Sequence, residues 1–321
     1  MTQRWIARAA LAFGAAGLVL PLVGPAALDL SRVWARQDPD WSILWQLRVS
    51  RTLLALFGGG ALGLAGALFQ SMLRDALATP YTLGVSTGAS LGAVIAIVAG
   101  WHAVAGVPGI WAGALAGAAI ALALVVAAAS RQRRTSALGL LLAGMAINSV
   151  CAAAILLVHG LSSAAQSFAI ARWLIGSVDA IDYPALTVFI LAVTSVTVIV
   201  VSQARDWNLM AVGETWAASR GTDLGRSMTI GCVCGSVLAA VTVALVGPIG
   251  FIGLVVPHLV RTRISADDRV LMPCAFFFGG ALLAACDALG RVVLAPAEVP
   301  AGAMTAFVGG PYLAWIIRRR M

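Results

Sequence analysis

The sequence predicts an all-α fold: a polytopic membrane helix bundle of about ten transmembrane helices, forming one domain over residues 1–321. The first observation behind this prediction is composition, because 61% of the residues are hydrophobic and only 11% are charged. A soluble domain carries about a quarter charged residues and could not bury so much apolar surface. The second observation is that the apolar residues form successive runs, many of them close to the roughly 20 residues that a helix needs to cross a bilayer.

These runs place the helices in chain order. They lie near residues 9–28, 52–72, 84–100, 110–129, 137–159, 184–202, 228–246, 249–260, 270–286 and 300–317. The first run has the flanking charge and apolar core of a signal peptide, but no small-residue cleavage site stands out after it. We therefore expect an uncleaved first helix, and ten spans that put both termini on one side of the membrane.

The arginines orient this bundle, because positive charge concentrates in the cytoplasmic loops of membrane proteins. With both termini inside, fifteen of the 21 arginines fall in inner segments: Arg4, Arg8, Arg74, Arg131, Arg133, Arg134, Arg205, Arg220, Arg226, Arg261, Arg263, Arg269, Arg318, Arg319 and Arg320. The other six fall outside: Arg32, Arg36, Arg48, Arg51, Arg172 and Arg291. This bias predicts that both termini are cytoplasmic.

Two longer segments interrupt the short loops. Residues 160–184 are expected outside the membrane. Residues 203–227 are expected inside; they mix charged and apolar residues and predict one or two short helices with an apolar face. Two interpretations of this inner segment remain open: a helix that lies on the lipid surface, or a docking surface for a cytoplasmic partner.

Glycines recur at a spacing of four residues within several of the predicted helices. In a membrane this spacing lets two helices approach closely. The pairs are Gly59/Gly63, Gly88/Gly92, Gly113/Gly117 and Gly231/Gly235. The sequence therefore predicts a tightly packed bundle, without indicating which helices pair.

Several classes of function are excluded or disfavoured. All 21 basic residues are arginines, so the chain has no P-loop, which requires a lysine. The net charge of +8 resides mainly in short loops and indicates no nucleic-acid partner. A secondary transporter would need acidic or histidine relays within the membrane, and the predicted spans hold almost no acid. A membrane enzyme would need converging His, Asp, Glu or Cys residues, so neither a catalytic nor a metal site is predicted.

Three long stretches carry a specific resemblance. They are RVSRTLLALFGGGALGLAGALFQSMLRDALATPYTLGVSTGASLGA from Arg48 to Ala93, GPIGFIGLVVPHLVR with the following DDRVLMP from Gly247 to Pro273, and CDALGR with AEVPAGAMTAFVGGPYLAWII from Cys286 to Ile317. In order and spacing these stretches resemble the FecCD-type permeases. These are the membrane subunits of type II ABC importers for iron-siderophores, haem and vitamin B12.

The resemblance implies an assembly and a direction of transport. It implies a homodimer in the lipid of the bacterial inner membrane, with two ATP-binding-cassette ATPase subunits on the cytoplasmic side and a periplasmic substrate-binding protein. An iron complex, either a siderophore or haem, would pass from periplasm to cytoplasm by alternating access, with a corrinoid as the alternative cargo. The chain itself would bind no cofactor and would not be an enzyme, because ATP and Mg²⁺ belong to the ATPase subunits.

The resemblance also assigns roles to residues. Arg48, Arg51 and Arg291 match arginines that receive acidic residues of the binding protein, although they could instead snorkel to the membrane interface. Asp287 or Glu298 could pair with Arg291, and Glu298 could favour the start of the last helix. Residues 203–227, here called the coupling segment, match the helices that contact the ATPase. Its candidate residues are Leu209, Gly213, Glu214, Trp216, Arg220 and Gly221.

Two further predictions concern the translocation path. Asp75 and Leu77, with Thr135 and Ser136, match the segments that form the inner gate at the dimer axis. Asp75 could act on cations there or pair with Arg74. Asn148 is a polar residue within a predicted span, so it must either bond to a neighbour or line the path.

Overall fold

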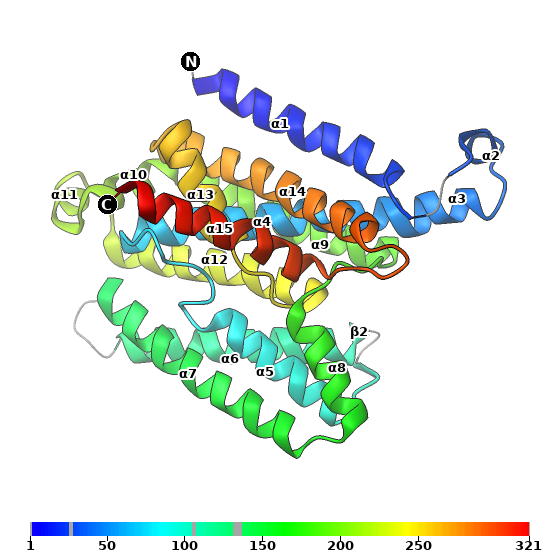
Figure 1. Cartoon of the computed structure of the whole chain (residues 1–321). Coiled ribbons are helices and arrows are strands. Elements are labelled where there is room, and N and C mark those ends of the chain that lie inside the picture. The colour runs from blue at the N-terminus through cyan, green and yellow to red at the C-terminus, as the bar shows by residue number, and fades with distance from the viewer. Residues whose placement is uncertain (1, 26–27, 105–106, 131–136, 321) are drawn as a thin grey trace.

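A computed structural model describes residues 2–25, 28–104, 107–130 and 137–320, and these residues form a helical bundle, as predicted (Figure 1). In the described part of the chain, the strands are β1 (Ala103–Val104) and β2 (Val107–Pro108), which pair as a short antiparallel hairpin. Both termini lie at the left end of the bundle in Figure 1.

A helix occupies each of the ten predicted apolar runs. They are α1 (Thr2–Val19), α4 (Ser50–Leu73), α5 (Val85–Val98), α6 (Gly109–Ser130), α7 (Ala137–Leu161), α9 (Tyr183–Ser202), α12 (Leu224–Val246), α13 (Ile252–Arg263), α14 (Asp268–Val293) and α15 (Ala301–Arg320). Among the described residues, seven helical stretches are long and apolar enough to cross a membrane, and they contain α1, α4, α6, α7, α9, α12 and α14.

Two of the ten helices are too short to cross a bilayer alone. At 1.5 Å per residue, the 14 residues of α5 and the 12 residues of α13 rise about 21 Å and 18 Å, against a hydrocarbon core of about 30 Å. Each follows a non-helical segment, residues 74–84 and 247–251. Irregular backbone is tolerated at membrane depth where protein covers it, and Ala78, Leu83 and Ile249 in these segments are buried.

The first helix differs from its prediction in position. It begins at Thr2 and its α-helical part ends at Val19, whereas the apolar run predicted residues 9–28. A 3₁₀ turn, η1 (Leu20–Leu22), contains Pro21, and extended chain follows at Val23. Proline lacks the N–H that an α-helix needs, so the helix ends before the apolar run does.

Shorter elements occupy the segments between the spans. They are α2 (Leu30–Trp34), α3 (Asp40–Ser42), the π-helical turn η2 (Ile43–Val49) that leads into α4, α8 (Ala164–Ile175), α10 (Ala204–Val212) and α11 (Glu214–Ser219). The last two confirm the prediction of one or two short helices in the coupling segment, and the structure has two.

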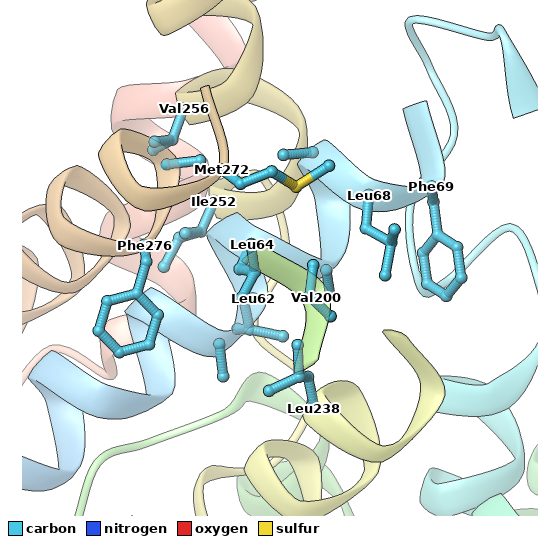
Figure 2. Packing of buried hydrophobic residues seen from close by; sticks show 14 of the residues in the cluster. Leu62, Leu64, Leu68, Phe69, Val200, Leu238, Ile252, Val256, Met272 and Phe276 are labelled. Atoms are coloured by element: carbon cyan, nitrogen blue, oxygen red, sulfur yellow. The ribbon is translucent and has the colours of Figure 1, made fainter. Parts of the chain in front are cut away.

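Helix α4 is the centre of the bundle. It packs against α14, α12, α13 and α9. Figure 1 shows α1 and α14 on one side of it and α5, α6 and α7 on the other. Leu238 of α12, Ile252 of α13 and Met272 of α14 belong to the same buried cluster as Leu64 of α4 (Figure 2).

Three of the predicted glycine pairs lie where two helix backbones approach each other closely. A Cβ on Gly59 would lie 2.4 Å from the carbonyl oxygen of Gly279 on α14. A Cβ on Gly92 of α5 would lie 2.0 Å from the carbonyl oxygen of Gly113 on α6, and Gly117 meets Gly88 in the same way. These distances leave no room for a side chain, so the prediction of close packing is confirmed, and the structure identifies the partners.

Candidate functional site

The predicted site residues gather at the two ends of the α4–α14 pair. Because the two helices run antiparallel, the start of α4 lies beside the end of α14. There Arg51 of α4 meets Asp287 and Arg291 of α14. At the opposite end, Arg74 follows α4, and Asp268 begins α14. We call the first end the arginine end and the second the coupling end.

Arg51 is the hub of the arginine end. Its Nη2 donates to Oδ1 of Asp287 at 2.9 Å and its Nε donates to both carboxylate oxygens at 3.1 and 3.2 Å. Its Nη1 donates to Oε2 of Glu298, in the loop between α14 and α15, at 2.9 Å. A guanidinium that bonds a carboxylate through two nitrogens is held in a fixed orientation. Arg51 therefore ties α4 to α14 and to the loop before α15.

Arg291 lies one helical turn after Asp287 and shares its carboxylate. The Arg291 Nε is 3.5 Å from the Asp287 Oδ2, and the two side chains are only 4% and 2% exposed. Of the two partners considered for Arg291, the structure thus gives Asp287. Glu298 bonds Arg51 instead, and at 48% exposure it is the outermost member of the cluster.

Arg48 lies in η2, inside the protein rather than on its surface. It is 5% exposed, and its Nη1 donates to the carbonyl oxygen of Leu22 at 3.4 Å. A Cβ on Gly24 would meet the Arg48 guanidinium at 2.6 Å, so the chain after α1 passes directly over this side chain. Arg48 is thus held below the surface at the arginine end, where Arg51 bonds Asp287 and Glu298.

At the coupling end, the side chains of the coupling segment divide between core and surface. Leu209 packs against the core, whereas Trp216 is 47% exposed and Val212 is 71% exposed. The Arg220 guanidinium lies 4.6 Å from the centre of the Trp216 ring, a cation–π distance. The exposed residues Val212, Trp216 and Arg220 are here called the α11 surface.

Glycines shape the turns around α11. Gly213 separates α10 from α11. Gly221 follows α11 with a φ of 86°, a left-handed conformation that side-chain-bearing residues rarely adopt. Next to Gly213, the Glu214 Oε1 accepts from the Nη2 of Arg74 at 3.3 Å, so α11 is tied to the end of α4.

A polar network connects α10 to the start of α14. Asn208 donates through its Nδ2 to Oδ1 of Asp267 at 2.7 Å and accepts from the backbone N–H of Asp268 at 2.8 Å. The buried Asp268 Oδ1 accepts from the hydroxyl of Ser71 at 2.8 Å, and that hydroxyl also accepts from Arg261 at 3.1 Å. Residues of α10, α14, α4 and α13 are thereby joined through consecutive hydrogen bonds.

Two of the four predicted gate residues, Asp75 and Leu77, lie within the described part of the chain. Leu77 is exposed, and its backbone N–H donates to the Asp75 carboxylate at 2.9 Å. The side chain that bonds Arg74 is Glu214. Thr135 and Ser136 lie outside the described residues.

Asn148 in α7 bonds to a neighbouring helix. Its side-chain oxygen accepts from the hydroxyl of Thr87 in α5. This contact satisfies one of the two possibilities predicted for a polar residue within a span. The role of Asn148 in the path stays a prediction.

Several residues of the two ends were not singled out by sequence reasoning. Asn208 fell inside the coupling segment without an assigned role, and Ser71, Arg261 and Asp268 fell inside the resembling stretches without one. The DDR sequence before α14 is a helix-start signal, and Asp267 does cap the helix by accepting from the N–H of Arg269. Within the described residues, no group of three or more His, Cys, Asp or Glu is placed to hold a metal ion.

Known proteins resemble this chain over most of its length. A sequence model of the FecCD transport family matches residues 11–319. The chain is 34% identical to the hemin transport system permease protein HmuU of Yersinia pestis, over 97% of this chain and 92% of that protein. It is 35% identical to the vitamin B12 import system permease protein BtuC of Salmonella paratyphi A, over 85% of this chain and 83% of that protein.

A solved structure has the same fold. It is an inward-facing ABC transporter of proposed metal-chelate type, with a TM-score of 0.85, 25% sequence identity and 99% coverage of both chains. With seven apolar spanning helices among its described residues, this chain is a multi-pass membrane protein. The chain belongs to the FecCD transport family and is the permease subunit of an ABC importer.

Proposed function

We propose that the chain works as a homodimer that moves an iron complex, either haem or a ferric siderophore, from the periplasm to the cytoplasm by alternating access. Two ATPase subunits would supply the energy and a periplasmic binding protein would deliver the cargo. The main observation in support of this proposal is that the arginine end and the α11 surface lie at opposite ends of one helix pair, α4 and α14. The likeness to a hemin permease over 97% of this chain supports haem, and the likeness to a vitamin B12 permease keeps a corrinoid as the second candidate.

The proposed topology puts the coupling end in the cytoplasm of a bacterium and the arginine end in the periplasm. The excess of arginines in the loops on the coupling side supports this orientation. Both termini and the coupling segment lie at the same end of the bundle in Figure 1. Both termini would then be cytoplasmic.

Docking of the binding protein would act mainly through Arg51. Its bond to Glu298 is the exposed one, whereas its bond to Asp287 is buried. A carboxylate of the binding protein would replace Glu298 on Arg51 and leave the Asp287 pair intact. Arg48 and Arg291 are buried, so they would not touch the binding protein. Their positive charges would still attract its acidic surface and speed its association.

On the opposite side, the α11 surface would enter a groove of the ATPase subunit. The bond from Glu214 to Arg74 and the Asn208 network would then carry a displacement of α10 and α11 to the ends of α4 and α14. Interhelical shifts of this kind are a common form of switching transition. Asp75 and Leu77, with Thr135 and Ser136, would form the gate that this shift opens, and Asn148 would lie along the path.

The proposed function is tested by reconstitution. The permease is placed in liposomes with its ATPase subunit, and uptake of haem, a ferric siderophore or cobalamin is measured with the binding protein outside and ATP inside. We expect uptake of an iron complex only when ATP and the ATPase subunit are both present. Uptake driven by a proton gradient without ATP would contradict the proposal, and uptake of cobalamin alone would replace the iron complex by the corrinoid.

The α11 surface gives a second prediction. Trp216→Ala is expected to weaken binding of the ATPase subunit about tenfold, because truncating an aromatic anchor at an interface costs more than about 1 kcal/mol. The control is Trp34→Ala at the arginine end, where Trp34 is 86% exposed. Affinity is measured by pull-down titration in detergent, and equal affinities for both variants would remove α11 from the interface.

A further inference from the structure

An apolar groove opens on the face of the bundle formed by α6, α9 and α12. Its volume is about 550 Å³. Its walls are the starts of α6 and α9 and the end of α12. The residues that line it are Val107, Pro108, Trp111, Leu115, Asp182, Pro184, Ala185, Val188, Phe189, Ala192, Val241, Ala244 and Leu245.

The groove lies on the outer surface of the helix bundle. Leu115 of α6 and Val188 of α9 line it and are exposed. The long apolar stretches of α6 and α9 are mostly unburied, 28% and 22% buried respectively. In a multi-pass membrane protein, exposed apolar helices of this length contact hydrocarbon, so lipid chains have direct access to the groove.

The rim of the groove nearest the arginine end is acidic. Asp182, which lines the groove directly, precedes α9, and its carboxylate makes no capping bond to that helix. A second cavity of about 230 Å³ shares Pro108, Trp111 and Leu245 with the groove and is lined by Asp179. Among the described residues that line the two cavities, none is Arg, Lys or His.

The acidic rim lies at the level expected for lipid headgroups. The backbone N–H of Ile181 donates to the Ser50 hydroxyl at 3.2 Å, which puts the rim beside the start of α4 at the arginine end. Trp111 and Trp173 line the same region, and tryptophan is enriched at membrane–water interfaces. The two carboxylates are thus at the end of the hydrocarbon-facing groove and not along it.

We propose that this groove binds a phospholipid with a primary ammonium headgroup, of the phosphatidylethanolamine type. Its acyl chain lies between α6, α9 and α12, and its ammonium group bonds the carboxylates of Asp179 and Asp182. An anionic lipid such as phosphatidylglycerol meets two carboxylates and, among the described lining residues, no cation, so it is disfavoured. A quaternary ammonium has no N–H to donate, so phosphatidylcholine gains less than an ethanolamine headgroup does.

The test is lipid titration of the purified, delipidated full-length chain by native mass spectrometry. Phosphatidylethanolamine is expected to bind at least about tenfold more tightly than phosphatidylglycerol. The double variant Asp179→Asn with Asp182→Asn is expected to abolish that preference, whereas Asp29→Asn, a change in an exposed loop carboxylate at the same end, is expected to keep it. Ala192→Phe fills the groove and is expected to lower the bound lipid, whereas Ala12→Phe on the exposed face of α1 is expected to leave it unchanged.

Two results would overturn the proposal. Equal binding of both lipids, unaffected by the aspartate variants, would mean that the groove does not select an ammonium headgroup. Disulfide cross-linking between two copies of Val188→Cys, with no lipid bound, would mean that a second copy of the chain covers the groove. Thermal unfolding of each variant in detergent separates loss of lipid binding from loss of folding.

Discussion

Replacing Asp287 with leucine is expected to destabilise the folded chain by about 3–5 kcal/mol, the usual cost of removing one partner of a buried ion pair. The Asp287 carboxylate is 2% exposed and lies between two guanidiniums, at 2.9 Å from Arg51 Nη2 and 3.5 Å from Arg291 Nε. Without it, Arg291 would keep a positive charge in a buried position. The measurement is thermal unfolding in detergent, together with the fraction of folded protein in the membrane.

Two further variants establish the cause. Asp29→Asn is the control, because the Asp29–Arg32 pair is exposed at 3.6 Å and such pairs contribute at most about 1 kcal/mol. Asp287→Leu combined with Arg291→Leu removes the carboxylate and the more deeply buried of its two guanidinium partners, while Arg51 keeps its bond to Glu298, so part of the lost stability is expected to return. A double variant as unstable as Asp287→Leu would mean that the unpaired charge of Arg291 is not the cause of the loss.

The Asp287 network also affects how docking should be tested. Arg51→Glu would place a third carboxylate beside Asp287 and Glu298, so weaker docking would be confused with a disturbed fold. Glu298→Gln is a sharper change, because it removes the negative charge that competes for Arg51 and leaves the buried pair in place. If a carboxylate of the binding protein competes with Glu298, this variant should not bind that protein less tightly than the natural chain does.

Gly66→Leu is the second change with a large expected effect. A Cβ on Gly66 of α4 would lie 1.9 Å from the carbonyl oxygen of Gly253 on α13. Backbone cannot yield as a flexible side chain does, so the cost is expected to exceed the roughly 1–3 kcal/mol typical of overpacking. The same carbonyl accepts from the Gln70 side chain at 3.2 Å, and that bond would be lost as well.

Gly14→Leu is the matched control for this prediction. Gly14 lies in α1, another long apolar helix, and a Cβ there would meet nothing within 4 Å. Replacing an open helical glycine is expected to leave stability unchanged or to raise it slightly, because glycine is a poor helix former. The two variants are compared by size-exclusion chromatography and melting temperature. Equal melting temperatures would show that α4 and α13 do not pack as closely as described.

The sequence predicted the helical class, the approximate positions of the helices after the first, and one or two short helices in the coupling segment. These features depend on local properties: the length of each apolar run and the change of composition at residues 203–227. The predicted range of the N-terminal helix was wrong because the apolar run continues past Pro21. Hydropathy measures how apolar a residue is and takes no account of the backbone N–H that proline lacks. Helix α5 is shorter than its predicted run and α13 begins three residues after the start of its own, since an apolar segment can enter the bundle as covered irregular backbone.

The sequence by itself determined that the chain is a membrane helix bundle and, through three long stretches, which family it resembles. It also marked Arg51 and Glu214 as candidate site residues, and Asp287 and Glu298 as candidate partners of Arg291. Only the tertiary structure decided those partners: Arg51 bonds Asp287, 236 residues further along the chain, and Arg74 bonds Glu214. The length of an apolar run and the spacing of glycines are properties of a single helix, so they can be found in the sequence. Charge pairing depends on which helices lie side by side in the folded bundle.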